Sequence, residues 1–150
     1  MTQKRDTQIR ELPDGESHLA HEAMRALRPA QQDEQEFVNY VDGVLRPTGY
    51  RLIGAFAPER EQAAAAAGFR ISDSMALGHH LYLEDLSTVP DRRREGHARA
   101  LLEWLVQEAR RQDCGQLHLD SVVGPERFDA HRFYHGNGFA IYAHHFARIL

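Results

Sequence analysis

The chain has 150 residues, of which 42% are hydrophobic and 27% are charged, and its formal net charge is -4 with histidine neutral. This length suits a single domain over residues 1–150 with a sizeable core, and no apolar run approaches the ~20 residues of a membrane-spanning helix. The acidic balance argues against bulk nucleic-acid binding, for which a basic surface is expected.

Two further features bear on the cellular location. Cys114 is the single cysteine, so no intrachain disulfide can form, and a lone thiol beside a helix end is expected to be semi-buried and structural. Residues 1–6 lack the apolar segment of a secretory leader. We therefore expect a cytoplasmic protein that does not associate with a membrane.

Short apolar patterns separated by turn residues fill the first third of the chain. Residues 8–12 predict a strand that ends at a Pro-Asp-Gly turn. Apolar residues four apart then predict a helix that Ser17 could cap. Asp33, followed by Glu36 three residues later, is typical of the start of a second helix, which Pro47 ends.

The segment after a predicted strand at residues 50–57 gives conflicting signals. Residues 63–67 are five alanines, and alanine is the best intrinsic helix former. However, only about ten residues separate Pro58 from Gly68, which is short for a stable helix. The alternative is a hairpin turn at residues 58–61 followed by a strand with small side chains.

The rest of the chain alternates between the two kinds of secondary structure. Strands are expected at residues 80–89, 116–121 and 139–150, and helices at residues 96–112 and 124–134. The first of these helices is the clearest, because Leu101, Trp104 and Leu105 form one apolar stripe. The complete order, β-α-α-β-β-β-α-β-α-β, predicts an α/β fold around a mixed sheet.

A basic loop joins the strand at residues 80–89 to the helix that follows. Arg92, Arg93 and Arg94 lie in this loop, and Arg99 lies in the first turn of the helix. The start of a helix has unpaired backbone N–H groups and the positive end of the helix dipole, a combination that binds phosphate. Helix starts ordinarily favour acidic side chains, so the arginines favour an anionic ligand.

The loop is similar to a known cofactor motif. Residues 93–98 read Arg-Arg-Glu-Gly-His-Ala, in which Gly96 and Ala98 are small enough for the backbone to approach a pyrophosphate closely. This resembles the acyl-CoA loop, [Q/R]-x-x-G-x-[G/A], of the GCN5-related N-acetyltransferase (GNAT) superfamily. Residues 130–139 resemble a second signature of that superfamily, A-x-x-[F/L]-Y-x-x-x-G-F. One departure is Arg127, which stands where many relatives have an asparagine that helps to hold the pantetheine arm.

The resemblance implies the GNAT fold, a mixed and mostly antiparallel central sheet flanked by helices, and it favours a strand at the five alanines. It also implies acetyl-CoA as co-substrate. The amides of residues 94–99 are then expected to hold the diphosphate, and the backbone of residues 86–88 to pair with pantetheine and present an N–H to the thioester oxygen. The implied cofactor-binding residues are Leu86, Ser87, Thr88, Arg93, Arg94, Glu95, Gly96, His97, Ala98, Arg99, Arg127 and Ala130.

The same resemblance indicates two catalytic residues. Tyr134 is the candidate general acid, because a tyrosine with a pKa near ~10 stays protonated at neutral pH and can donate to a departing thiolate. The alternative is that Tyr134 only packs against Phe133. Glu84 and Asp85 are adjacent on a strand, so they should point to opposite faces unless a bulge intervenes, and only one should reach the cleft.

Polyamine acetyltransferases carry a Tyr-Leu-Glu-Asp run similar to residues 82–85, and there the glutamate position serves the amine. We therefore favour Glu84 as the general base, acting directly or through a water. The alternative is that both carboxylates are solvated or paired with cations at the end of a strand.

The ten histidines raise the question of a metal site. His131 and His135 are four residues apart on a predicted helix, which is the spacing of a zinc pair. The glutamate of the H-E-x-x-H motif is replaced by Arg132, however, so we expect no metal.

The expected reaction is acetyl transfer from acetyl-CoA to the primary amine of a small molecule, either a polyamine or another amino metabolite. Two alternatives stay open: acetylation of a peptide or protein amine, and a non-catalytic module that binds acyl-CoA. We expect a homodimer, because the final strand at residues 139–150 offers an unpaired edge.

Overall fold

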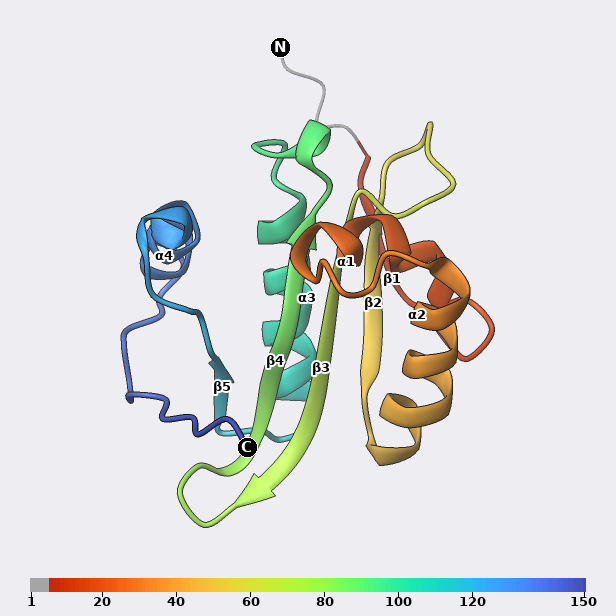
Figure 1. The fold of residues 1–150 in the computed structure, drawn as a ribbon. Helices are drawn as coiled ribbons and strands as arrows, with labels where there is room; N and C mark the ends of the chain where they lie inside the picture. Colours follow the sequence, from red (N-terminus) through yellow and green to blue (C-terminus); the bar gives the residue numbers. More distant parts are fainter. Residues whose placement is uncertain (1–5) are drawn as a thin grey trace. The chain divides into compact units, whose positions relative to one another are not determined.

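The computed structural model describes residues 6–150 (Figure 1). Residues 1–5, which belong to the stretch considered above for a leader, lie outside the described part. The chain divides into two compact units, Met1–His118 and Leu119–Leu150, and each is described by itself.

Within residues 6–150, no helix is long and apolar enough to cross a membrane.

The first unit holds most of the regular structure. Its elements are β1 (Gln8–Glu11), the short helix η1 (Ser17–Ala20), α1 (His21–Leu27), α2 (Glu34–Tyr40), the π-turn η2 (Val41–Leu45), the short helix η3 (Arg46–Thr48), β2 (Arg51–Phe56), β3 (Ala65–Ser74), β4 (Gly78–Thr88), η4 (Pro90–Arg92) and α3 (His97–Arg111). Strand β5 (Gln116–Leu119) begins in this unit. The second unit contains η5 (Pro125–Arg127) and α4 (Phe128–Gly136).

The sheet follows the chain, with the strand order β1-β2-β3-β4-β5. Strands β1 to β4 pair in antiparallel fashion. Strand β5 is reached through the crossover helix α3, and the sheet is therefore mixed and mostly antiparallel, as expected from the sequence. In the first unit, α1 and α2 cover one face of the sheet and α3 covers the other (Figure 1).

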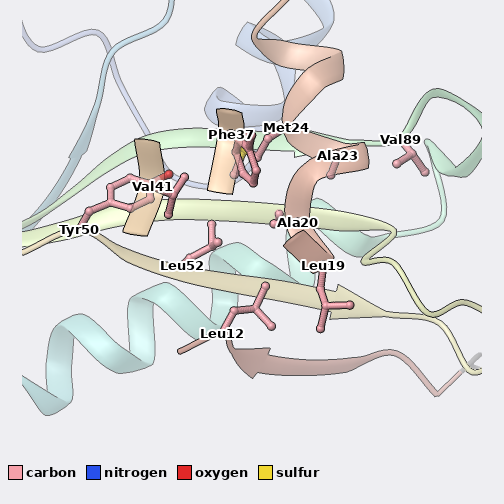
Figure 2. Close-up of a cluster of buried hydrophobic side chains, with 11 residues drawn as sticks. Leu12, Leu19, Ala20, Ala23, Met24, Phe37, Val41, Tyr50, Leu52 and Val89 are labelled. Carbon is pink, nitrogen blue, oxygen red and sulfur yellow. The ribbon is translucent and has the colours of Figure 1, made fainter. Parts of the chain in front are cut away.

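The apolar core of the first unit lies between the sheet and α1 and α2 (Figure 2). It contains Leu12, Leu19, Ala20, Ala23, Met24, Phe37, Val41, Tyr50, Leu52, Ala66 and Val89. On the other face, Leu101 and Leu105 of α3 are fully buried, and Trp104 makes an edge contact with Phe69 of β3. The apolar stripe predicted for this helix is confirmed.

The five alanines form the end of a hairpin connection and the first residues of β3, which confirms the strand over the helix. Ala63 to Ala67 are all fully buried. The backbone of Ala64 donates to Ala55 and accepts from Val89, at 2.8 and 2.9 Å, so it joins two neighbouring segments. Burial in the middle of the sheet outweighs the helix propensity of alanine, since propensity is a weak preference that tertiary packing overrides.

Two expectations of local structure have opposite outcomes. Asp33 caps α2, because its carboxylate accepts a hydrogen bond from the Glu36 amide at 2.8 Å. Ser17 caps no helix. Its hydroxyl is buried and instead donates to Asp42 at 2.6 Å, and it also accepts from Arg46 at 2.8 Å.

The predicted strand at residues 139–150 is wrong, because these residues have no regular secondary structure. Their alternating apolar pattern is real, but a strand forms only where it pairs with a neighbour. The large apolar residues exposed in this segment are Ile141, Tyr142, Phe146, Ile149 and Leu150.

A β-bulge in β4 shapes the centre of the first unit. Gly68 of β3 lies opposite Asp85, and Phe69 lies opposite Leu83, so Glu84 is the extra residue on β4. A bulge interrupts the alternation of side chains along a strand. The cavity described below is lined by both Glu84 and Asp85, which a regular strand would place on opposite faces.

Gly68 is required beside this bulge. A Cβ atom at this position would overlap the hydroxyl and ring of Tyr50. The space that the glycine leaves lets the buried Tyr50 donate a hydrogen bond to Asp85 Oδ2 at 2.9 Å.

An ion network attaches α3 to the sheet. Glu108 of α3 is buried and accepts hydrogen bonds from Arg51 of β2 at 2.8 Å and from Arg111 at 2.6 Å. Arg51 also holds Glu11 of β1 through two bonds of 2.7 and 2.9 Å. Burial by itself raises the pKa of Glu108, but bonds from Arg111, Arg51 and Gln112 outweigh it and lower the pKa to about 2.

We expect Gly68→Ala to destabilise the protein by about 2 kcal/mol or more, since the new methyl group must displace Tyr50 from a packed site. Urea denaturation measures this free energy of unfolding. Gly43→Ala is the matched control, because a Cβ at Gly43 meets no atom within 4 Å. Equal stabilities for the two variants would contradict the role given to Gly68.

The lowered pKa of Glu108 predicts a pH-dependent contribution to stability. Because the pKa of about 2 in the folded state lies below the ordinary 4.5, the contribution is complete above pH 4.5 and is lost as the pH falls toward 2. We expect Glu108→Gln to cost about 3 kcal/mol at pH 7 and about 1 kcal/mol at pH 3. Urea denaturation at both pH values measures this difference, and Glu103→Gln, which removes an exposed partner of Arg99, is the control. A cost for Glu108→Gln that does not change with pH would refute the assignment.

Candidate active site

The start of α3 offers unpaired backbone donors. Gly96 caps the helix with φ 87°, and no side chain caps it. The first α-helical hydrogen bond runs from the Ala100 amide to the Gly96 carbonyl at 3.0 Å, so the amides of residues 97–99 precede the helical ladder. Arg94 also has a positive φ, of 63°. Left-handed residues in a short loop gather backbone N–H groups into a concavity that suits an anion.

The arginines of the loop divide into two kinds. Arg92 is held by Glu59 at 2.5 Å, and this hydrogen bond raises the pKa of the guanidinium. Arg93 and Arg94 have exposed side chains, and Arg99 lies 3.4 Å from Glu103 on the exposed side of the helix. The first turn of α3 contains no acidic residue, so its positive end is not compensated there.

Two of the implied cofactor residues in this loop have side chains that are buried or small. The ring of His97 is 97% buried and lies near Thr7, at 3.4 Å, and near Glu95, at 3.6 Å, so it is part of the packing beneath the loop. Glu95 also lies 3.7 Å from Arg92. Ala98 is half-buried and adds only a methyl group, which keeps the approach to the amides open.

Alternate backbone amides at the end of β4 face away from β3. Val89 donates to Ala64 at 2.9 Å, so in the antiparallel ladder the amides of Ser87 and Val89 face β3. The amides of Leu86 and Thr88 therefore face the opposite edge. Strand β5 is the neighbour of β4 on that side, and just before it the Gly115 amide donates to the carbonyl of His79 at 2.9 Å.

A cavity of about 490 Å³ lies beside the bulge, entirely within the first unit. Its floor carries Glu84, Asp85 and the buried Tyr50. The other residues that line it are Met24, Leu27, Arg28, Pro29, Ala30, Gln31, Phe37, Tyr40, Val41 and Leu45. The expectation that only one of the two carboxylates reaches the cleft is wrong, because the bulge brings both to it.

Each carboxylate of the floor is paired with an arginine. Arg70 of β3 donates to Glu84 Oε1 at 2.8 Å. Arg28 donates to Asp85 Oδ1 at 2.9 Å, and the hydroxyl of Tyr50 occupies Asp85 Oδ2. Burial raises the pKa of Tyr50 well above its ordinary value, and the charge of Asp85 adds to this rise. Tyr50 therefore stays protonated and acts as a donor.

The remaining predicted residues lie in the second unit. Tyr134 on α4 makes edge contacts with the rings of Phe133 and Phe139. Burial raises the pKa of Tyr134, while the positive charge of Arg127 acts in the opposite direction. The Arg127 Nε is buried and has no hydrogen-bond partner within residues 6–150. Ala130 lies one helical turn before Tyr134.

The two histidines of the predicted pair have different surroundings. His131 Nε2 lies 3.0 Å from both the Ser121 hydroxyl and the Val122 carbonyl, and His135 is exposed. No group of three or more His, Cys, Asp or Glu side chains arranged to hold a metal occurs in the described part of the chain. Cys114 is half-buried, as expected, and burial raises the pKa of its thiol.

The structure thus brings Glu84, residues 86–88 and residues 93–99 together on one strand and the loop that follows it. The sequence reasoning missed Tyr50, Arg28 and Arg70, which hold the two carboxylates. None of the three belongs to a local motif, since each lies 14 or more residues from its partner. The register of the strands reveals Arg70, and the packing of the end of α1 and of the start of β2 against β4 reveals Arg28 and Tyr50.

Comparisons with known proteins agree with this architecture. The sequence model of the acetyltransferase (GNAT) family matches residues 16–139. An uncharacterized N-acetyltransferase, YhdJ, of Bacillus subtilis strain 168 is 29% identical over 102 residues, which are 68% of this chain and 69% of that protein.

Solved structures share the fold at low sequence identity. An acetyltransferase of Trypanosoma brucei is 22% identical with a TM-score of 0.76, over 97% of this chain and all of that one. The aminoglycoside N-acetyltransferase AAC(6')-Iy, solved in complex with CoA, is 18% identical with a TM-score of 0.76, over 95% of this chain and 94% of that one. Because the family match covers most of its length, the chain belongs to the acetyltransferase (GNAT) family of acyl-CoA-dependent N-acetyltransferases.

Proposed function

We propose that the protein transfers the acetyl group of acetyl-CoA to the primary amine of a small molecule by direct attack. The observation that carries this proposal is the start of α3, where the amides of residues 97–99 precede the helical ladder and Arg94 and Gly96 have positive φ in the loop that follows β4. The cavity with Glu84 and Asp85 lies on the same strand.

The residues at the start of α3 fit the diphosphate of CoA. The amides of residues 97–99 precede the helical ladder, and the first turn of the helix contains no acid. The exposed side chains of Arg93 and Arg94 add positive charge beside these amides. This arrangement supports diphosphate binding by residues 93–99.

The edge of β4 that faces away from β3 suits the pantetheine arm. The amides of Leu86 and Thr88 face away from β3, so an extended chain of amides could pair with them as an added strand does. An N–H at this edge can also stabilise the negative charge that develops on the thioester oxygen. In this proposal the acetyl group lies beside residues 86–88, which directly follow Glu84 and Asp85 along β4.

Glu84 is the better placed base of the two carboxylates. Asp85 uses both oxygens, one for Arg28 and one for Tyr50, whereas Glu84 is held through Oε1 by Arg70. The amine nitrogen attacks the thioester carbon, and Glu84 accepts the proton that the nitrogen loses, directly or through a water. The C–S bond then breaks, and the sulfur departs as a thiolate.

Tyr134 supplies the proton to that thiolate in this proposal. The burial that raises its pKa keeps it protonated at neutral pH, which a general acid requires. Arg127 and Ala130 are assigned to the pantetheine side of the site, as the family pattern implies. The resulting tyrosinate recovers its proton from solvent.

We also propose that the protein works as a homodimer in the cytoplasm. The support for a dimer is the group of exposed apolar residues from Ile141 onward, which a second copy could cover.

A small-molecule acceptor is favoured over a peptide or protein amine, because the cavity is of a size that suits a small molecule.

We expect Ala98→Asp to weaken binding of acetyl-CoA by at least about tenfold, since the new carboxylate stands where the diphosphate is proposed to bind. The same change should leave the protein equally or more stable, because an acid in the first turn favours a helix. Isothermal titration calorimetry and thermal unfolding measure the two effects. Gln107→Glu, which adds the same charge to an exposed position of α3, is the control. If the folded native protein binds neither CoA nor acetyl-CoA, the proposed function is wrong.

We expect Tyr134→Phe to lower kcat by about 100-fold and to change the affinity for acetyl-CoA by less than about threefold, because the hydroxyl acts only when the thiolate departs. Release of free CoA thiol in the presence of an amine measures the rate. Tyr142→Phe, the same change at an exposed tyrosine, should have no effect. An unchanged kcat in Tyr134→Phe would leave Tyr134 as a packing residue.

A further inference from the structure

The cavity at the bulge of β4 restricts the chemistry of the acceptor, and the inference drawn from it rests on the proposed function. The cavity has a volume of about 490 Å³, which is enough for a small molecule. Its walls include Phe37, Tyr40, Val41 and Leu45, which come from α2 and the turn after it. Most of the surface of an occupant would therefore contact carbon.

The charges at the floor of the cavity balance one another. Glu84 and Asp85 are the only carboxylates among the described residues that line it. Arg70 binds Glu84 at 2.8 Å, and Arg28, which also lines the cavity, binds Asp85 at 2.9 Å. Two guanidinium groups thus match two carboxylates, and the floor has no excess of negative charge.

This balance limits how many positive charges the acceptor can bring. One amino group can lie against Glu84, and it becomes neutral before it attacks the thioester. A second ammonium group would leave water for an apolar wall without a carboxylate of its own, and burying an unmatched charge is unfavourable. A hydrocarbon or aromatic body would instead replace water against Phe37, Tyr40 and Leu45, which is favourable.

We infer that the acceptor is a primary monoamine attached to an apolar, preferably aromatic, body, and that polyamines are poor acceptors. The amino group lies at Glu84, and the body lies against the walls formed by α2 and the turn after it. This narrows the proposed class of small primary amines to its apolar members.

A matched pair of amines tests the inference. Hexylamine and 1,6-diaminohexane have the same carbon chain and differ by one terminal ammonium group. With acetyl-CoA held constant, we expect kcat/KM for hexylamine to exceed that for 1,6-diaminohexane by at least about tenfold, with 2-phenylethylamine at least as good as hexylamine and spermidine poor. A higher kcat/KM for 1,6-diaminohexane or spermidine than for hexylamine would overturn the inference.

A pair of variants tests whether the cavity itself causes the preference. Tyr40 is 47% exposed and lines the cavity, so Tyr40→Glu adds a carboxylate to the wall at little cost to the core. We expect it to shift the ratio of kcat/KM toward the diamine by about tenfold. Val44→Glu adds the same charge to η2, the turn that follows α2, outside the cavity lining and should not change the ratio. Equal shifts in both variants would overturn the inference.

Binding of the amines without acetyl-CoA separates this inference from the proposed function. Thermal shift of the native protein with each amine reports binding in the absence of turnover. Preferential binding of hexylamine with no acetylation of any amine would support the cavity assignment and reject the transferase proposal. Acetylation with a preference for diamines would support the transferase proposal and overturn the cavity assignment. If no amine binds and none is acetylated, both are rejected.

Discussion

The bulge at Glu84 is the constraint on which the rest of the site depends. In a regular strand, Glu84 and Asp85 would lie on opposite faces of the sheet, and only one could reach the cavity. The extra residue brings both to the cavity. Gly68 makes room for Tyr50, and the hydrogen bond from Tyr50 to Asp85 fixes the strand next to the bulge. A single glycine on β3 therefore controls the arrangement of charges on β4.

The two carboxylates of the floor are held in different ways. Asp85 has a partner on each oxygen, so it serves to hold Arg28 and Tyr50 in place. Glu84 is held on one side by Arg70 of the neighbouring strand, which limits its rotation. For Glu84 as the proposed base, a fixed position limits the entropy that is lost when the amine binds, and prearranged geometry lowers the barrier of a reaction between bound groups. The same pairs remove the net negative charge that a polycation would need.

The sequence predicts those parts of the fold that depend on local patterns. The stripe of α3, the cap at Asp33 and the loop between β4 and α3 all follow from residues within one or two turns of each other. It cannot predict Tyr50, Arg28 or Arg70 at the carboxylates, because these contacts depend on the register of the strands, on one bulge and on how α1 packs against β4. The strand predicted at residues 139–150 is wrong for a related reason. The alternating pattern of this segment gives the propensity for a strand but not the partner that a strand requires.

The departure from the family pattern at Arg127 has a consequence for the proposed acid. A buried tyrosine holds its proton more tightly, and a thiolate with an ordinary pKa near ~8.5 is a weaker base than tyrosinate. Proton donation from Tyr134 to the thiolate is therefore favourable only if the tyrosinate that forms is stabilised. The positive charge of Arg127 acts in that direction, since it opposes the rise in the pKa of Tyr134 that burial causes. An asparagine carries no charge and would not have this effect, so in the proposed mechanism the arginine favours proton release from Tyr134.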